Sequence, residues 1–142
     1  MTRTPEELAA GLDAWVADRF DELVGVRRHL HMHPELAYAE VETTAYLEQR
    51  LTEAGLAPRR LPSGTGLVVD VGSGTGGAGP TVVLRADIDA LPLADLKEVP
   101  YASTREGMCH ACGHDVHTTV VLGAALALAE LDGLPGTVRC VF

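Results

Sequence analysis

Metal-binding residue types crowd one short segment of the sequence, residues 109–115 (Cys-His-Ala-Cys-Gly-His-Asp), and His117 follows just beyond it. Thiolate, imidazole and carboxylate groups are the ligands that borderline-soft transition metals such as zinc prefer. Gly113 lets the backbone turn so that Cys112 and His114 can point toward one ion. A helix that begins here would also favour the thiolate over the thiol. The segment therefore predicts a transition-metal site.

The same residues allow other interpretations. For an isolated cysteine or histidine, a role in the core or in capping a helix would be favoured. A thioredoxin-like C-x-x-C pair of Cys109 and Cys112 is a further possibility, although such a motif usually begins its helix at the first cysteine. A structural zinc site needs a second ligand pair, and Cys140 supplies only one more thiol. A c-type haem requires C-x-x-C-H, and Gly113 stands where that histidine would be.

Two aspartates spaced by one residue, Asp87 and Asp89, follow an apolar segment. Open α/β sheets place their sites at the carboxyl ends of strands. On a continuing strand both carboxylates would face the same side, where they can bind a cation or orient a metal-bound histidine through a hydrogen bond. A turn that caps the strand is the structural alternative.

A third cluster contains His29, His31 and His33, directly ahead of Pro34 and Glu35. A spacing of two places all three on one face only in an extended chain, whereas in a helix only His29 and His33 align. Taken alone, this cluster favours a structural role at a helix end over metal binding.

Helices and strands alternate among the elements that must position these residues. Thr4 is placed as the cap of a helix that begins at Pro5, and a stripe of apolar residues continues until shortly before Pro34. The spacing predicts a second helix over residues 41–54, with Gly55 in the position of a left-handed cap. Both helices are expected to cover a sheet.

The remainder of the chain predicts strands and a buried helix. Residues 66–71 and 81–84 are β-branched segments, expected to form two strands joined as a hairpin by the glycine-rich residues 72–80. The glycines Gly72, Gly74 and Gly77 match G-x-G-x-x-G, but a strand rather than a helix follows, which disfavours a dinucleotide site. A helix is expected over 116–131 with Asp115 as its cap, and a strand over 138–142. Together these elements predict an α/β domain with a mainly parallel or mixed sheet.

Length and composition exclude several classes of protein. The chain has 142 residues, of which 46% are hydrophobic and 22% charged, as in one folded globular domain. A net charge of -9 disfavours nucleic acid and anionic membrane surfaces as partners. The single lysine, Lys97, leaves little room for Schiff-base or Walker-type chemistry. Three cysteines do not suit a disulfide framework, and no leader or membrane segment is recognisable, so a cytoplasmic location is expected.

Three ordered blocks make the sequence resemble a known family. They are residues 27–36 (RRHLHMHPEL), 85–92 (RADIDALP) and 110–118 (HACGHDVHT). In this order they resemble the amidohydrolase branch of the aminoacylase and carboxypeptidase metallopeptidases, which includes hippurate hydrolase and indoleacetyl-amino-acid hydrolases. The resemblance covers about residues 20–142. It implies an α/β layered sheet with flanking helices, part of a zinc-exopeptidase-like catalytic domain.

The resemblance also implies an activity and its residues. The activity is metal-dependent hydrolysis of N-acyl amino acids to an amino acid and a carboxylic acid. Two divalent metal ions, drawn from Zn, Mn, Co or Ni, would share Cys112 as a bridging ligand and bind His114 directly. The pair Asp87 and Asp89 matches the family's H-x-D segment with aspartate in place of the first histidine, which gives both carboxylates supporting roles. The resemblance assigns no role to Cys109.

Family members continue beyond the strand at 138–142 into paired glutamates, further histidine ligands and a lid domain that mediates dimerisation. Residues 1–142 are therefore expected to be the N-terminal part of the catalytic domain, inactive alone, and to form a homodimer only with the lid domain. The expected partner is a small N-acyl amino acid. Because the sequence stops within an apolar strand, an unpaired sheet edge is expected there. The alternative function is a non-enzymatic metal-binding or C-x-x-C redox module.

Overall fold

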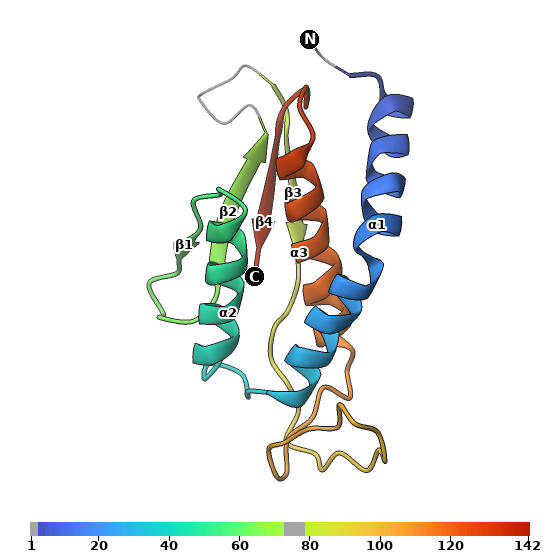
Figure 1. Cartoon of the computed structure of the whole chain (residues 1–142). Coiled ribbons are helices and arrows are strands. Elements are labelled where there is room, and N and C mark those ends of the chain that lie inside the picture. Colours follow the sequence, from blue (N-terminus) through green and yellow to red (C-terminus); the bar gives the residue numbers. More distant parts are fainter. Residues whose placement is uncertain (1–2, 73–78) are drawn as a thin grey trace.

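The protein is an α/β structure, as expected, in a computed structural model that describes residues 3–72 and 79–142 (Figure 1). Gly74 and Gly77 of the G-x-G-x-x-G match lie outside these described residues. In chain order the elements are α1 (Pro5–Met32), α2 (Val41–Glu53), β1 (Arg59–Arg60), β2 (Leu67–Gly72), β3 (Thr81–Arg85), α3 (His114–Glu130) and β4 (Thr137–Val141).

The sheet is mixed, and within the described residues its strand order is β1-β2-β4-β3. Strand β4 pairs antiparallel with β2 and parallel with β3, so that Cys140 lies opposite Val69 on one side and Leu84 on the other. The expected hairpin of β2 and β3 is therefore wrong. The two strands are not neighbours because the β3-α3-β4 crossover places β4 beside β3, in the position that a hairpin would give to β2.

The expectation of an unpaired sheet edge at the last strand is also wrong. Strand β4 is paired on both sides, and Phe142 just beyond it is buried and exchanges two backbone hydrogen bonds of 2.9 Å with Leu67. The edges of the described sheet are β1 and β3 instead. On β3, Val82 and Val83 are both exposed.

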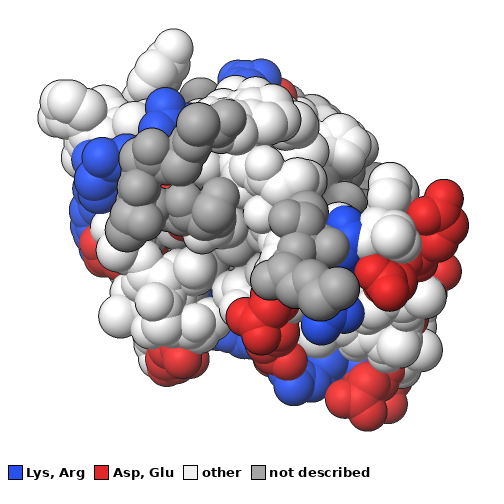
Figure 2. Space-filling view, turned by 90° about the horizontal axis from the view of Figure 1, so that it is seen from above, with Lys and Arg blue, Asp and Glu red and all other residues white. Residues whose placement is uncertain are grey.

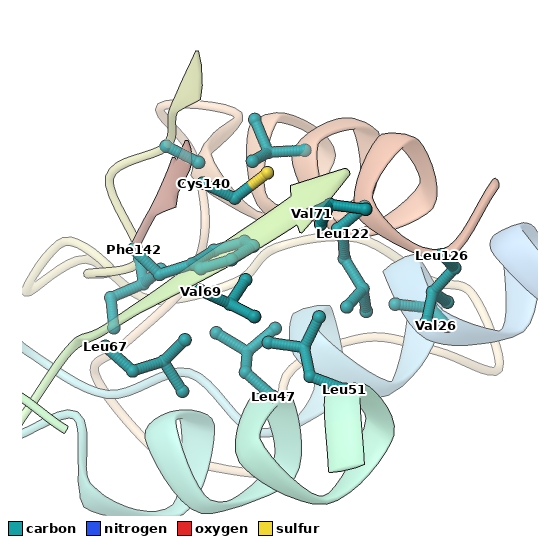
Figure 3. Packing of buried hydrophobic residues seen from close by; sticks show 14 of the residues in the cluster. Val26, Leu47, Leu51, Leu67, Val69, Val71, Leu122, Leu126, Cys140 and Phe142 are labelled. Carbon is teal, nitrogen blue, oxygen red and sulfur yellow. The ribbon is translucent and has the colours of Figure 1, made fainter. Parts of the chain in front are cut away.

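The core lies between the sheet and the helices α2 and α3 (Figures 1 and 3). Alternate residues of β2 are buried, because successive side chains of a strand point to opposite faces. Figure 3 shows Leu47 and Leu51 of α2 and Leu122 of α3 converging on the buried face of β2. This apolar layer holds α3, whose first turn carries the candidate site, against the sheet.

Helix α1 begins as its sequence predicts. The Thr4 hydroxyl accepts a hydrogen bond of 3.2 Å from the Glu7 amide, and the Glu7 carboxylate accepts one of 2.8 Å from the Thr4 amide. Its apolar stripe is only partly covered, since Phe20 is 59% exposed. The reason is visible in Figure 1, where α1 packs beside α3 and stands away from the strands. Helix α1 therefore covers α3 rather than the sheet.

Helix α3 begins two residues earlier than expected, at His114 rather than at Val116. Gly113 is the cap residue, with φ of 85°, a left-handed conformation that glycine adopts without strain. Asp115 is therefore not the N-cap. Its side chain turns inward instead, where it meets His31 and Arg27. Only one of its oxygens accepts a hydrogen bond from a helix amide, that of Val116 at 3.0 Å.

The surface carries charges of both signs. Figure 2, which looks onto the molecule from above Figure 1, shows acidic and basic side chains interspersed with uncharged ones. Among the described residues, no helix has the length and hydropathy needed to cross a bilayer.

Candidate active site

The two aspartates lie in an extended segment directly after β3. Ala86 and Ile88 are buried, whereas the carboxylates of Asp87 and Asp89 both face the partly open side. The alternation expected for a continuing strand therefore persists, although residues 86–89 are not assigned to one. The Asp87 carboxylate forms an ion pair of 2.5 Å with Arg85.

His114, the first residue of α3, is held by Asp89. Its Nδ1 atom lies 2.9 Å from the Asp89 carboxylate and 3.0 Å from the Asp89 carbonyl oxygen. Both of these atoms only accept hydrogen bonds, so we assign the hydrogen to Nδ1 and the lone pair to Nε2, which lies 3.9 Å from the Asp87 carboxylate. A carboxylate that orients a histidine in this way is the usual support of a metal ligand.

Cys112 lies beside the same aspartate. Its thiol is exposed and lies 3.9 Å from the Asp89 carbonyl oxygen, a weak S–H···O contact. The structure thus brings Cys112, His114, Asp87 and Asp89 close together. Within the described part of the chain, no group of three or more His, Cys, Asp or Glu side chains is arranged to hold a metal ion.

Thr118 fastens this start of α3 to the aspartate segment. Its hydroxyl lies 2.7 Å from the His114 carbonyl oxygen and 3.1 Å from the Asp87 carbonyl oxygen. Sequence reasoning missed Thr118. Its position one helical turn after His114 is the signal that could have found it.

A buried ionic layer lies beneath these residues. The Asp115 carboxylate accepts a hydrogen bond of 2.7 Å from His31 Nδ1 and lies 2.9 Å from Arg27 Nε. The Arg27 contact is an ion pair whose orientation gives no hydrogen bond. His31 is therefore a buried structural residue of α1, in line with the role that its cluster favours.

The second ring nitrogen of His31 contacts Asp95, which sequence reasoning also missed. His31 Nε2 lies 3.2 Å from the Asp95 carboxylate. Hydrogen bonds from the Lys97 ammonium and the Ser103 amide hold the pKa of Asp95 well below its usual range. This aspartate stands in a loop and has no periodic signal in the sequence, so only the folded chain identifies it.

His110 is buried between the two layers. Neither of its ring nitrogens has a hydrogen-bond partner among the described residues. Burial lowers the pKa of His110, which favours the neutral imidazole, while Asp115 acts in the opposite direction. Its ring centroid lies 6.4 Å from that of His31.

The segment that follows α1 has a structural role. The buried Glu35 carboxylate accepts hydrogen bonds from the amides of Glu42 and Thr43, at 3.0 and 2.6 Å, and so caps the first turn of α2. Its own carbonyl oxygen accepts a bond of 2.7 Å from the Ala90 amide, next to Asp89. Through these hydrogen bonds Glu35 aligns α2 with the segment that carries Asp87 and Asp89.

The cysteines do not form a disulfide. All three are free, and Cys109 is buried while Cys112 is exposed. The Cys109 backbone exchanges hydrogen bonds with Leu91, which places its thiol toward the Ala94 carbonyl oxygen, 3.9 Å away. Cys109 and Cys112 therefore differ in solvent exposure and in the carbonyl oxygen that each thiol contacts.

Comparison with known proteins confirms the family resemblance. Residues 83–142 match the model of peptidase family M20/M25/M40. The chain is 47% identical over 122 residues to N-acetyl-L-cysteine deacetylase of Bacillus subtilis, a match that covers 85% of this chain and 29% of that protein. It is 45% identical over 126 residues to IAA-amino acid hydrolase ILR1-like 5 of Arabidopsis thaliana, covering 88% of this chain and 28% of that protein.

A solved structure agrees. The fold matches a Bacillus subtilis protein described as a dinuclear metal binding peptidase from the M20 family, with a TM-score of 0.80 and 41% identity. The match covers 86% of this chain and 34% of that chain. The chain thus spans about a third of the length of the proteins it matches.

Proposed function

Because the chain belongs to peptidase family M20/M25/M40, we propose that residues 1–142 form the N-terminal part of the catalytic domain of a metal-dependent amidohydrolase. The substrates are small N-acyl amino acids, cleaved to an amino acid and a carboxylic acid. The similarity to an N-acetyl-L-cysteine deacetylase and to an IAA-amino acid hydrolase supports this substrate class. The observation that carries the proposal is the position of Asp89, whose carboxylate lies 2.9 Å from His114 Nδ1 and whose carbonyl oxygen lies 3.9 Å from the exposed Cys112 thiol.

Two divalent metal ions are the proposed cofactors, with Cys112 as a shared ligand and His114 as a direct one. The chemistry of the donor set fits, since a thiolate and an imidazole suit zinc, while Mn, Co and Ni are the other candidates. Bound metal ions supply polarisation of an amide carbonyl and a lowered pKa of bound water. The similarity to a dinuclear metal binding peptidase supports the number of ions.

The residues of this chain would orient and support that centre. Asp89 holds the ring of His114, Asp87 holds Arg85 at the rim, and Thr118 fixes the backbone between them. Below them, Asp115 anchors the first turn of α3 to α1 through His31. A rim that is partly open to solvent lets a small substrate approach.

The proposal also covers the cellular compartment and the partners of the protein. Three free cysteines suit a reducing compartment such as the cytoplasm. The net charge of -9 disfavours nucleic acid and anionic membranes as partners. A homodimer is proposed only for a protein that also carries the lid domain.

The assignment of Cys112 is tested by zinc titration of the chain and of two serine variants. Cys112→Ser should weaken zinc binding by at least about tenfold, because it removes a proposed direct ligand. The matched variant Cys109→Ser should retain zinc affinity, because that thiol is buried beside Ala94. Equal losses in both variants would contradict the assignment and favour a C-x-x-C zinc or redox site.

Activity is tested separately with N-acetyl and N-benzoyl amino acids. The 142-residue chain should show no measurable hydrolysis with added zinc or manganese, because two proposed ligands fall short of the three that catalytic zinc ordinarily has. A protein that continues past Phe142 into the paired-glutamate segment should hydrolyse these substrates and lose activity with Cys112→Ser. An inactive longer protein that still binds zinc would contradict the proposed reaction but not the metal site.

A further inference from the structure

A second pair of histidines lies at the end of α1, away from Cys112 and His114. His29 and His33 are one helical turn apart, and their ring centroids are 4.6 Å apart with an interplanar angle of 36°. Both rings line a cavity of about 210 Å³ between the end of α1 and the start of α2. His31 between them is buried on the other side, against Asp115. The pair is therefore separate from the candidate active site.

The hydrogen bond at His33 leaves a nitrogen of its ring available. His33 Nδ1 lies 2.8 Å from the His29 carbonyl oxygen, which can only accept, so Nδ1 carries the hydrogen. The Nε2 atom then holds a lone pair. Among the described residues, neither that atom nor the ring nitrogens of His29 have a hydrogen-bond partner.

The surroundings also hold the His29 ring in place and favour its neutral form. Its ring stacks on Tyr46 of α2, with centroids 4.2 Å apart. Burial, and secondarily the neighbouring His33, lower the pKa of His29. A neutral imidazole is the form that binds a metal ion. The His29 side chain therefore loses little conformational entropy when it binds an ion.

We propose that His29 and His33 together bind a divalent transition-metal ion, of the zinc, nickel or copper class, at the junction of α1 and α2. Imidazole suits these metals, and residues four apart on a helix are neighbours. Glu42 also lines the cavity, but its carboxylate is paired with Arg105, so water completes the coordination. The bound ion would link the last turn of α1 to its cap residue and stabilise the folded chain by mass action.

The experiment uses the full 142-residue chain with Cys112→Ser and His114→Ala, so that zinc binding at the proposed active site is removed. In this background, calorimetric titration with zinc should show one remaining site, and zinc should raise the thermal midpoint. His29→Phe keeps a ring on Tyr46, and His33→Asn keeps a side-chain donor for the His29 carbonyl. Each should weaken zinc binding at least about tenfold, since each removes a direct ligand.

His117→Ala, which removes an exposed histidine outside the pair, is the matched control and should leave zinc affinity unchanged. Zinc binding that survives both His29→Phe and His33→Asn would overturn the proposal, and so would a loss in His117→Ala as large as in those variants. Nitrogen-detected NMR of the parent chain needs no further substitution. Zinc should shift the ring nitrogens of His29 and His33 together, and unshifted signals would overturn the proposal. None of these outcomes bears on Cys112, so failure here is distinguishable from failure of the proposed active site.

Discussion

Two adjacent residues at the start of α3 have opposite surroundings. The His114 side chain is 21% exposed and contacts Asp89 and Asp87 at the rim, whereas the Asp115 side chain is 1% exposed and contacts His31 and Arg27. The first belongs to the rim with Cys112 and Asp89, and the second to the buried ionic layer beneath. Adjacent side chains of one helical turn can therefore lie at a partly open rim and in a buried ionic layer, because each points to a different environment.

The buried ionic layer and the rim differ in how much free energy an unpaired polar group costs. A buried carboxylate without its partners would lose its solvation and gain nothing in return, so Asp115 must be paired. A residue at the rim can leave an atom unpaired at little cost, since solvent reaches it. Substitutions in the buried layer should therefore change stability, and substitutions at the rim should change metal affinity.

The largest effect on stability is expected for Asp115→Ala. The substitution removes the acceptor of His31 Nδ1 and the ion-pair partner of Arg27, which should lower the free energy of unfolding by about 3–5 kcal/mol. Urea denaturation followed by circular dichroism measures it, with exposed Asp13→Ala as the control. A loss below about 1 kcal/mol would show that the buried layer is not the stabilising one.

The loss of folding stability at acid pH should depend on Asp95. Its folded pKa lies below that of the unfolded chain, because Lys97 and the Ser103 amide stabilise the carboxylate. The stabilisation is therefore complete above the unfolded pKa of about 4 and is lost as the pH falls toward the folded value. Urea midpoints measured between neutral and acid pH should fall less steeply in Asp95→Asn. Parallel profiles for both proteins would contradict this account.

A smaller loss is expected for Glu35→Ala at the start of α2. The substitution removes the acceptor for the amides of Glu42 and Thr43, and the loss of a helix cap costs about 0.5–2 kcal/mol. Thermal unfolding of this variant beside the exposed Glu98→Ala measures the difference. Equal stability of both variants would mean that solvent replaces the cap.

The smallest change in stability is expected at the rim, for Asp89→Asn. Unfolding should change by no more than about 0.5 kcal/mol, as for other partly exposed residues. Zinc affinity should fall by about 10–100-fold, since the orienting charge of Asp89 is removed from His114. A variant that loses stability but keeps its zinc affinity would reverse the roles of the two layers.

Local chemistry in the sequence predicted much of this arrangement. The capping residues predicted where α1 begins, and the pattern of apolar residues predicted the helices and the longer strands. The spacing of Asp87 and Asp89 predicted their common orientation, and Gly113 predicted the turn between Cys112 and His114. These features depend on neighbours a few residues apart, so the sequence alone contains their physical causes. The two-residue strand β1 was missed because it is too short to show a period.

Contacts between distant segments were decided only by the tertiary structure. The position of β4 between β2 and β3 depends on pairing with two partners at once, and no local pattern records which strand intervenes. Asp115 resembles a cap in sequence, but the buried His31 ring, 84 residues away, gives its carboxylate a better partner than the helix amides. The order of residues along the chain places a cysteine, a histidine and an aspartate at the start of α3. The tertiary structure decided which of them stay open to solvent and which become buried ion pairs, because burial depends on what packs above each side chain.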